Sequence, residues 1–265
     1  GDQKLFVYRV AYSQTDLSYT RVLGNDWNIT SGMYFQRNKL NPDVVGGDYY
    51  RGNISNYFAY LASESITTDR VNFPTRGHLF FAQAGVVFGR QAQIDHTFED
   101  GTTEDVSNIL DNVPEYYRVM FNFTKFNPLS KKTVLFYTLQ SSIAIQSQGF
   151  IVDNFYLGGV QQLFRQQVAF VGLNEQQINS TSLASAQLGI QYNFAGNLFL
   201  MGRANTGIYD FSTETKYWDS DTVDNVNGFG LGLGYNLGFL PMELTASYSP
   251  EIGDVYAHMK IGFIF

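Results

Sequence analysis

Residues 255–265 at the end of this chain constrain its fold more than any other stretch. Every second position carries an apolar side chain, and these positions are Val255, Ala257, Met259, Ile261, Phe263 and Phe265. The positions between them are Tyr256, His258, Lys260, Gly262 and Ile264. Successive side chains of a β-strand point to opposite faces, so this stretch is predicted to be a strand with one apolar face and one mostly polar face.

The same alternation recurs along the chain and predicts about twelve strands. The expected strands cover residues 4–13, 15–23, 27–39, 55–69, 78–92, 115–127, 132–147, 181–195, 197–210, 226–238, 241–250 and 255–265. Short and long connections alternate between them, and the long ones lie at residues 40–54, 93–114, 148–180 and 211–225. Outer-membrane barrels have short periplasmic turns and longer outer loops, and an even strand number places both termini on one side. We therefore expect both termini to be periplasmic.

Residue usage favours a membrane barrel over a soluble sandwich. Charged residues make up 15% of the chain and aromatic residues 16%, whereas a soluble domain carries roughly 25% charged residues. A soluble β-sandwich also alternates, but with polar outward faces and shorter strands. No apolar run reaches the roughly 18 residues of a membrane-spanning helix, so strands must do any spanning. The predicted fold is an all-β transmembrane antiparallel β-barrel that forms a single domain over residues 1–265 and lies in the bacterial outer membrane.

Several ligand classes are disfavoured. The chain has no cysteine, which excludes disulfides and thiolate zinc sites. Its three histidines lie far apart in the sequence, and no metal or other cofactor is expected. The net charge of −7 argues against nucleic acid as a partner. The loops at 93–114 and 211–225 are rich in Asp and Glu, but their spacing matches no EF-hand pattern, so we interpret them as solvated surface.

One long connection and one glycine-rich strand stand out from this pattern. Residues 148–180 are too long for an ordinary hairpin loop and contain many large apolar side chains. Loops of this length are usually functional or disordered, and because this one is so apolar we expect it to fold into the barrel interior. Residues 228–234 have glycine at every second position while an apolar partner set continues between them. This pattern predicts a strand with room on its inner face, for a bend or for a loop pressed against the wall.

Two motifs give the chain a resemblance to a known family. Asp153-Asn-Phe155-Tyr-Leu-Gly158-Gly159, followed by Leu163-Phe164-Arg165, resembles the inward-folding sixth outer loop of the BamA/TamA-type superfamily, the bacterial surface antigen family of assembly and secretion barrels. The stretch from Asp69 to Gly77 resembles the aromatic-proline-threonine-x-glycine turn of the same superfamily. Five expected strands follow the long loop, and the chain ends on phenylalanine, as in that superfamily. The resemblance is greatest to barrels of the Bacteroidetes type, including those linked to patatin-like phospholipase domains.

The resemblance implies a set of site residues. The plug of the lumen would be carried by Phe155, Gly158, Gly159, Phe164 and Arg165. The wall facing the plug would be formed by Arg203, Asn205, Gly207, Glu243 and Glu64. In the superfamily the tip arginine meets an aspartate-x-glycine, whereas the matching positions here begin with an asparagine, whose neutral amide forms a weaker hydrogen bond. We therefore expect Arg165 to be held more loosely, or by Glu243 or Glu64. The terminal Phe263 and Phe265 would form the signal that the barrel assembly machinery recognises.

The implied function is non-enzymatic: translocation or insertion of polypeptides, or membrane anchoring of an upstream domain. The expected partners are outer-membrane lipid, the barrel assembly machinery and a polypeptide substrate. A passive small-solute pore and a surface adhesin are the alternatives, and an outer-membrane phospholipase is a further one. The phospholipase needs serine, histidine and asparagine together, yet no histidine here lies beside a Ser-Asn-Gly sequence, and no GxSxG motif occurs.

Overall fold

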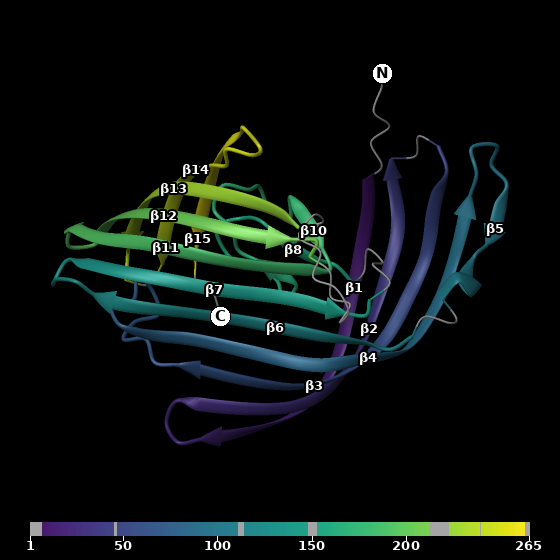
Figure 1. Ribbon diagram of the computed structural model, residues 1–265, viewed down its shortest axis with the longest axis horizontal. Coiled ribbons are helices and arrows are strands. Elements are labelled where there is room, and N and C mark those ends of the chain that lie inside the picture. The colour runs from purple at the N-terminus through teal and green to yellow at the C-terminus, as the bar shows by residue number, and fades with distance from the viewer. Residues whose placement is uncertain are drawn as a thin grey trace.

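Figure 1 shows a computed structural model of the chain, which describes residues 7–44, 47–110, 114–147, 153–211, 223–238 and 240–262. One large antiparallel sheet dominates it. In sheet order its long strands are β1 (Val7–Leu23), β2 (Trp27–Val44), β3 (Tyr49–Ile66), β4 (Gly77–Thr97), β6 (Tyr116–Pro128), β7 (Thr133–Ile145), β11 (Ser182–Ala195), β12 (Leu198–Tyr209), β13 (Asp224–Asn236), β14 (Pro241–Tyr248) and β15 (Val255–Ile261). The short strand β5 (Thr103–Asp105) pairs with β4, and a 3₁₀ turn, η1 (Ser107–Leu110), follows it.

The longest connections lie at one end of this sheet, as the sequence pattern predicted. The connections at residues 24–26, 67–76, 129–132, 196–197 and 237–240 lie at the other end, which we call the turn end. The loop end holds the long connections at residues 98–115, 146–181 and 210–223, together with two shorter ones at residues 45–48 and 249–254. The all-β prediction with about twelve strands is confirmed, because the sheet contains twelve strands when β5 is counted.

The first two expected strands are in fact one strand, β1. No turn occurs near Gln14, because residues 14–16 continue the ladder and pair with Gln36, Phe35 and Tyr34 of β2. The polar residues 13–16 interrupt the alternation of apolar and polar side chains, but their backbone remains paired with β2. As a result β1 begins at the loop end while β15 finishes at the turn end, so the even-count argument for placing both termini on one side no longer applies.

Strands β2, β3 and β4 are longer at the loop end than expected. The connection predicted at 40–54 is mostly strand, since β2 continues to Val44 and β3 begins at Tyr49. Leu40 and Ile54 are buried there and pack against partly buried alanine and isoleucine side chains of β4. This small apolar cluster stabilises the strands beyond the positions where proline and glycine residues signalled a loop.

The outward face of the sheet is apolar and the concave face is polar or small. Leu188, Phe229 and Leu231 point outward and are 55%, 51% and 70% exposed. Buried polar side chains on the concave face include Gln36, Asn38, Asn56, Gln83, Arg118, Gln191 and Asn205. A wall with lipid outside and water or protein inside requires this inverted distribution.

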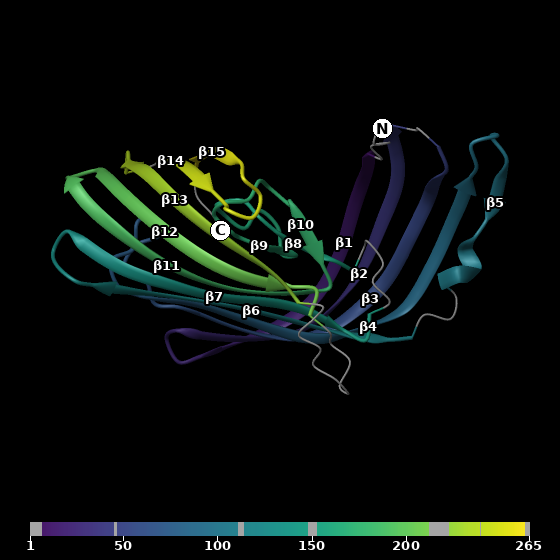
Figure 2. The same ribbon diagram turned by 45° about the horizontal axis from the view of Figure 1, so that its top comes forward.

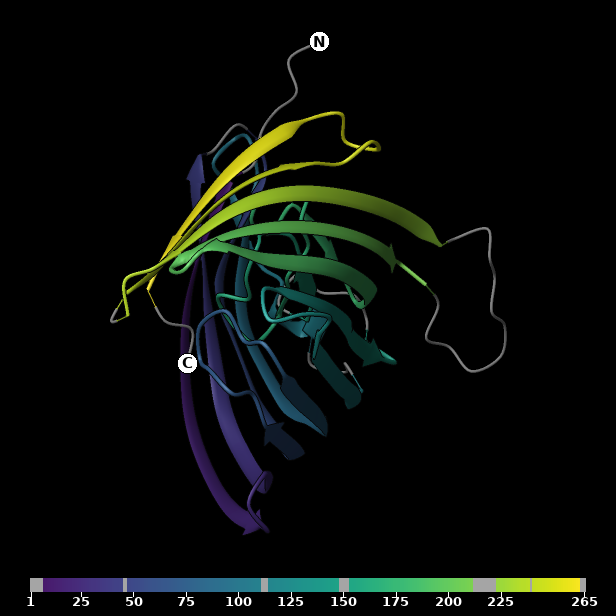
Figure 3. The same cartoon turned by 90° about the vertical axis from the view of Figure 1, so that its left-hand side faces the viewer.

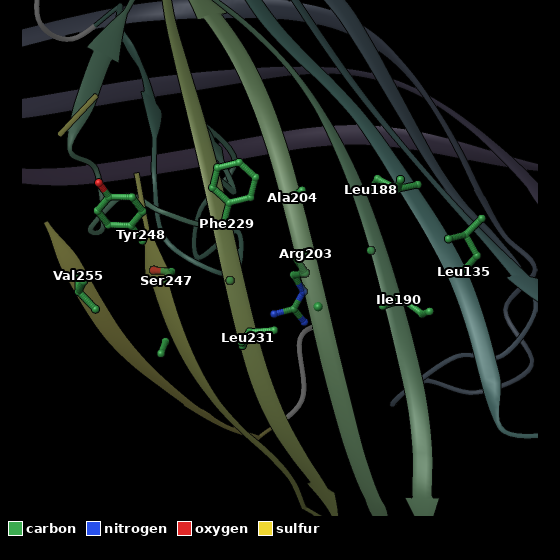
Figure 4. Close-up of a pocket in the computed structure, with 14 residues that line it drawn as sticks. Leu135, Leu188, Ile190, Arg203, Ala204, Phe229, Leu231, Ser247, Tyr248 and Val255 are labelled. Carbon is green, nitrogen blue, oxygen red and sulfur yellow. The ribbon is translucent and has the colours of Figure 1, made fainter. Parts of the chain in front are cut away.

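The outward face is hollowed over β11–β15. A shallow cavity of about 550 Å³ lies there, and Figure 4 shows the leucine, isoleucine, phenylalanine and tyrosine side chains around it. Its floor includes the small residues Gly202, Ala204 and Ala246. Such a surface is complementary to hydrocarbon rather than to polar ligands.

The sheet curls strongly around its concave face (Figures 2 and 3). β1 and β15 stand at the two ends of the strand order, and among the described residues no ladder joins them. None of the helical segments described is both long enough and apolar enough to cross a bilayer.

Candidate functional site

A folded loop occupies the concave face of the sheet (Figure 2). Residues 153–181, which we call the inner loop, connect β7 to β11 and contain three short strands: β8 (Phe155–Leu157), β9 (Gln167–Val168) and β10 (Ile178–Ser180). β8 lies in the middle, antiparallel to β10 and parallel to β9. Six apolar side chains of the inner loop are buried, namely Phe155, Leu157, Val168, Phe170, Val171 and Leu173. The inner loop therefore has a packed structure of its own.

The inner loop is fastened at its root by the carboxylate of Asp153, which is 0% exposed. Arg90 on β4 donates to Asp153 Oδ1 at 2.5 Å, and Tyr116 on β6 donates to the same oxygen at 2.8 Å. Ser147, just after β7, donates to Oδ2 at 3.1 Å. Charge-assisted hydrogen bonds of this kind are roughly twice as strong as neutral ones. One carboxylate thus joins the inner loop to three consecutive parts of the wall.

A β-bulge brings Arg90 into this cluster. The register between β3 and β4 shifts between Ser55 and Tyr57, where Gly89 has a φ of +61°. Because a bulge inserts one extra residue, it reverses which face the following side chains point to. Val87, before the bulge, points inward, and so does Ile94 after it. Without the bulge, the Arg90 side chain would point toward lipid.

A second buried arginine lies beside the root. Arg118 on β6 is 3% exposed and donates to the hydroxyls of Tyr116 at 3.0 Å and Tyr34 at 3.3 Å. Its guanidinium also lies 5.6 Å from the ring centroids of both Phe58 and Phe155. Cation–π contacts are strongest when the cation is desolvated. Arg118 therefore connects the first strand of the inner loop to β2, β3 and β6.

The paired glycines form the centre of the inner loop. Gly158 and Gly159 have φ values of +141° and +80°, which side chains disfavour. A Cβ on Gly158 would collide with the carbonyl oxygen of Asn174, and a Cβ on Gly159 would collide with the carboxylate of Glu175. Gln167 fixes the same region by donating to the Gly158 carbonyl at 2.7 Å and to Glu175 at 2.6 Å.

The returning limb of the inner loop lies on the glycine-lined face of β13. A Cβ on Gly228 would collide with the carbonyl oxygen of Val171, and one on Gly230 with the Val171 side chain. Asn205 on β12 donates to the Val171 carbonyl at 2.9 Å. A Cβ on Gly207 would lie 3.0 Å from the ring of Phe170. The inner face of β12 and β13 thus accepts backbone directly, which only small residues permit.

The tip residues lie elsewhere than the family pattern implied. Arg165 is exposed and makes no hydrogen bond or ion pair with Asn205, Glu243 or Glu64 in the described part of the chain. Its backbone carbonyl accepts a hydrogen bond from the Gln162 side-chain amide at 3.2 Å, within the inner loop itself. Phe164 is half-buried and packs edge-to-face on Tyr156, with ring centroids 5.7 Å apart.

Two of the charged residues expected on the wall pair with each other. Arg203 forms an ion pair with Glu243 across β12–β14, and Thr245 donates to the same carboxylate at 2.8 Å. Glu64 is exposed on β3. The expected assembly-signal residues Phe263 and Phe265 lie outside the described residues.

Four residues in or beside the root were not predicted as site residues from the sequence. Asp153 stood within the loop motif without a role, and Arg118 lay within an expected strand without one. Arg90 was hidden because simple alternation places it on the outward face. Tyr116 lay at the edge of an expected strand. A glycine that breaks the alternation immediately before an arginine is the signal that could have identified Arg90.

Comparisons with known proteins agree with this geometry. Residues 13–265 match the family profile described as the OMP85 superfamily. Among solved structures, CdiB from Escherichia coli is similar, with a TM-score of 0.60 and 12% identity over 97% of this chain and 46% of that one. BamA from Haemophilus ducreyi lacking POTRA domains 1–3 gives a TM-score of 0.56 and 12% identity over 96% of this chain and 62% of that one.

This chain therefore spans less than two thirds of the length of either structure. A comparison with curated protein sequences gave no match. The two structural similarities concern the fold, whereas the profile match extends over nearly the whole chain. The chain belongs to the OMP85 superfamily of outer-membrane β-barrels.

Proposed function

We propose that this barrel translocates polypeptide across the outer membrane or inserts it there, with residues 153–181 as a plug of the lumen. The docking of the inner loop at two separate places carries the proposal. At its root, Asp153 accepts hydrogen bonds from Arg90 of β4 and Tyr116 of β6. Its returning limb lies against β12 and β13. A loop built only as a solvated surface would need neither a buried ion pair nor a glycine-lined contact.

Edge strands supply the means of handling polypeptide in this proposal. β1 and β15 end the strand order, and an edge strand offers unpaired N–H and C=O groups to an incoming segment. An extended polypeptide that paired there would satisfy its own backbone groups inside the bilayer, where each unsatisfied group costs several kcal/mol. The plug keeps small solutes from passing while this exchange takes place. Membrane anchoring of an upstream domain is compatible with the same barrel.

One contact favours an enzyme, and we interpret it as structural. Ser65 Oγ lies 3.0 Å from His78 Nε2, as in a nucleophile–base pair. However, Ser65 is only 1% exposed, and the other ring nitrogen of His78 meets the hydroxyl of Thr67 at 2.9 Å rather than a carboxylate or an amide. The buried serine has no route to a substrate, so this trio stabilises the start of the turn after β3.

The plug is tested by conductance in planar bilayers. The variant Gly228→Ala places a methyl group where the Val171 carbonyl lies and must displace the returning limb of the inner loop. We expect a severalfold rise in open probability. The matched control is Gly202→Ala on the lipid-facing side of β12, where the new Cβ would lie 3.5 Å from Ile190. Equal conductance of the two variants would contradict the plug.

The polypeptide function is tested separately. An unfolded outer-membrane barrel polypeptide is mixed with liposomes that contain or lack the protein, and its insertion is followed by protease protection. Faster insertion in the presence of the protein supports the proposal. No acceleration by the full chain would leave a plugged barrel without insertase activity and would favour the anchoring role.

A further inference from the structure

The connection between β3 and β4 at the turn end is internally rigid. Asp69 accepts hydrogen bonds from the Thr75 amide at 2.8 Å, the Thr75 hydroxyl at 2.6 Å and the Arg76 amide at 3.2 Å. Its own amide donates to the Arg76 carbonyl at 3.3 Å. An aspartate that satisfies several backbone groups in this way fixes the shape of a turn.

This rigid turn presents Phe73 in a strained conformation. Phe73 has a φ of +49°, which is uncommon for a residue with a bulky side chain. Such strain persists only when surrounding contacts determine it, and it often marks a functional position. Here the contacts come from the far side of the sheet.

The Phe73 ring stacks on Phe199 of β12, with centroids 4.2 Å apart and planes 6° apart. Phe199 is 3% exposed. Gln191 on β11 points its amide at the carbonyl oxygens of Phe73 and Pro74, both at 3.5 Å. Strands β11 and β12 of the distant wall therefore contact the turn, and β13 contacts it as well.

On β13, the Phe73 ring lies against Gly234, where the lack of a side chain leaves room for it. A Cβ on Gly234 would lie 2.5 Å from Phe73 Cε1 and 3.1 Å from Met201. Gly234 is thus the floor of a notch whose walls are Phe199 and Met201. It belongs to the same alternating glycine series as Gly228, on which the inner loop docks.

The turn reaches this notch by crossing the concave face. β4 and β12 are separated by four pairings in the sheet order, through β6, β7 and β11. At about 4.8 Å per strand, the path along the wall is about 19 Å. A direct stacking contact over that separation requires the turn to leave the wall and span the inside of the curve.

We propose that residues 67–76 form a latch that closes the turn end of the lumen by inserting Phe73 into the notch of Phe199, Met201 and Gly234. The latch acts independently of the inner loop, which covers the lumen nearer the loop end. The two barriers use different parts of β13, so each can open without the other. This inference rests on the proposed barrel lumen and extends it to a second barrier.

The latch is tested by single-channel recording of this chain in planar bilayers. Phe73→Ala and Phe199→Ala each remove one ring of the stack, and we expect each to raise the frequency of openings severalfold. The double variant is expected to resemble the single ones, because both substitutions break one contact. Phe73→Tyr keeps the ring, so we expect its openings to be as rare as those of the unaltered protein. The control is Leu129→Ala, an exposed apolar residue in the neighbouring turn between β6 and β7.

Gly234→Ala provides a second route to the same result if a Phe variant fails to fold. It expels the ring while leaving Phe73 and Phe199 unchanged. Openings of Phe73→Ala and Gly234→Ala that match those of Leu129→Ala would overturn the latch. If Gly228→Ala still opened the pore in that case, the plug would stand and only the latch would fail. If all three stayed closed, the assignment of the lumen itself would be wrong.

Discussion

Asp153 shows how a single side chain can hold a long loop in one position. Its carboxylate accepts hydrogen bonds from an arginine, a tyrosine and a serine in different parts of the wall, and it is not exposed to solvent. Burying an ion pair contributes little net stability, because desolvation offsets the attraction, but removing one partner leaves an uncompensated charge. The pair therefore specifies where the inner loop begins rather than adding to the overall stability.

Substitution of Asp153 by asparagine keeps the shape and removes the charge. We expect Asp153→Asn to lower the free energy of unfolding by about 3–5 kcal/mol, since Arg90 would remain buried without its anion. Denaturant titration in detergent, followed by tryptophan fluorescence, measures the change. The control is Asp100→Asn, which alters an exposed carboxylate in the connection after β4. Equal midpoints for the two variants would contradict the role of Asp153.

At the scale of strands, Gly89 determines which residues reach the interior. Its left-handed conformation creates the bulge that reverses the facing of β4 and directs Arg90 inward. The bulge also lies opposite Asn56, two residues before Phe58, whose ring packs against the Arg118 guanidinium. A local backbone feature thus supplies the cation for the root of the inner loop.

The variant Gly89→Ala forces a side chain into this conformation. We expect a loss of about 1–2 kcal/mol from the strain alone, and a further loss if the strand straightens and turns Arg90 toward lipid. Combining it with Asp153→Asn separates these contributions, because the double variant should lose less than the sum of the single losses. Strict additivity in the unfolding measurements would mean that the bulge and the ion pair are unrelated.

The turn that carries Phe73 has a pH dependence of its own. Burial alone would raise the pKa of Asp69, but hydrogen bonds from Thr75 and Arg76 outweigh it and hold that pKa below 3.8. A depressed folded-state pKa contributes stability above the unfolded pKa, and this contribution is lost as the pH falls through the folded value. We expect conductance to stay low from neutral pH to about pH 4 and to rise below it. Asp69→Ala should be leaky at every pH, and a retained acid response in that variant would count against this explanation.

Alternation was sufficient to predict the all-β fold, the short turns and the outward faces, because lipid on one side imposes period two on every strand. It failed where that period is interrupted or continues through polar residues. The bulge at Gly89 reverses the facing of the side chains that follow it, so alternation assigned Arg90 to the wrong face. Around Gln14 the residues are polar, yet β1 continues through them without a turn. Phe73 was identified as part of a family turn, but its stacking on Phe199 joins residues 126 positions apart, which no local pattern reveals.

At the scale of the whole molecule, the apolar outward face determines the solvent the protein requires. Exposed leucine, phenylalanine and tyrosine side chains follow one another across β11, β12 and β13. Contiguous apolar patches larger than a few hundred Å² are rare on soluble monomers. This face must therefore be covered by lipid or detergent.

Removal of detergent provides the corresponding prediction. Size-exclusion chromatography in detergent micelles should give one symmetric peak, and dilution below the critical micelle concentration should give aggregates. Reconstitution into liposomes at that point should recover protease-resistant protein. A monodisperse, folded monomer in plain buffer would falsify the membrane assignment and, with it, the interpretation of the concave face as a lumen.

The glycine series of β13 has a practical consequence for engineering. Both obstructions rest on the same strand, one on Gly228 and Gly230 and the other on Gly234. Methyl groups added at these three positions would evict both obstructions, while no atom facing the hydrocarbon would change. A designer who wanted a nanopore sensor from this scaffold could begin with that one strand.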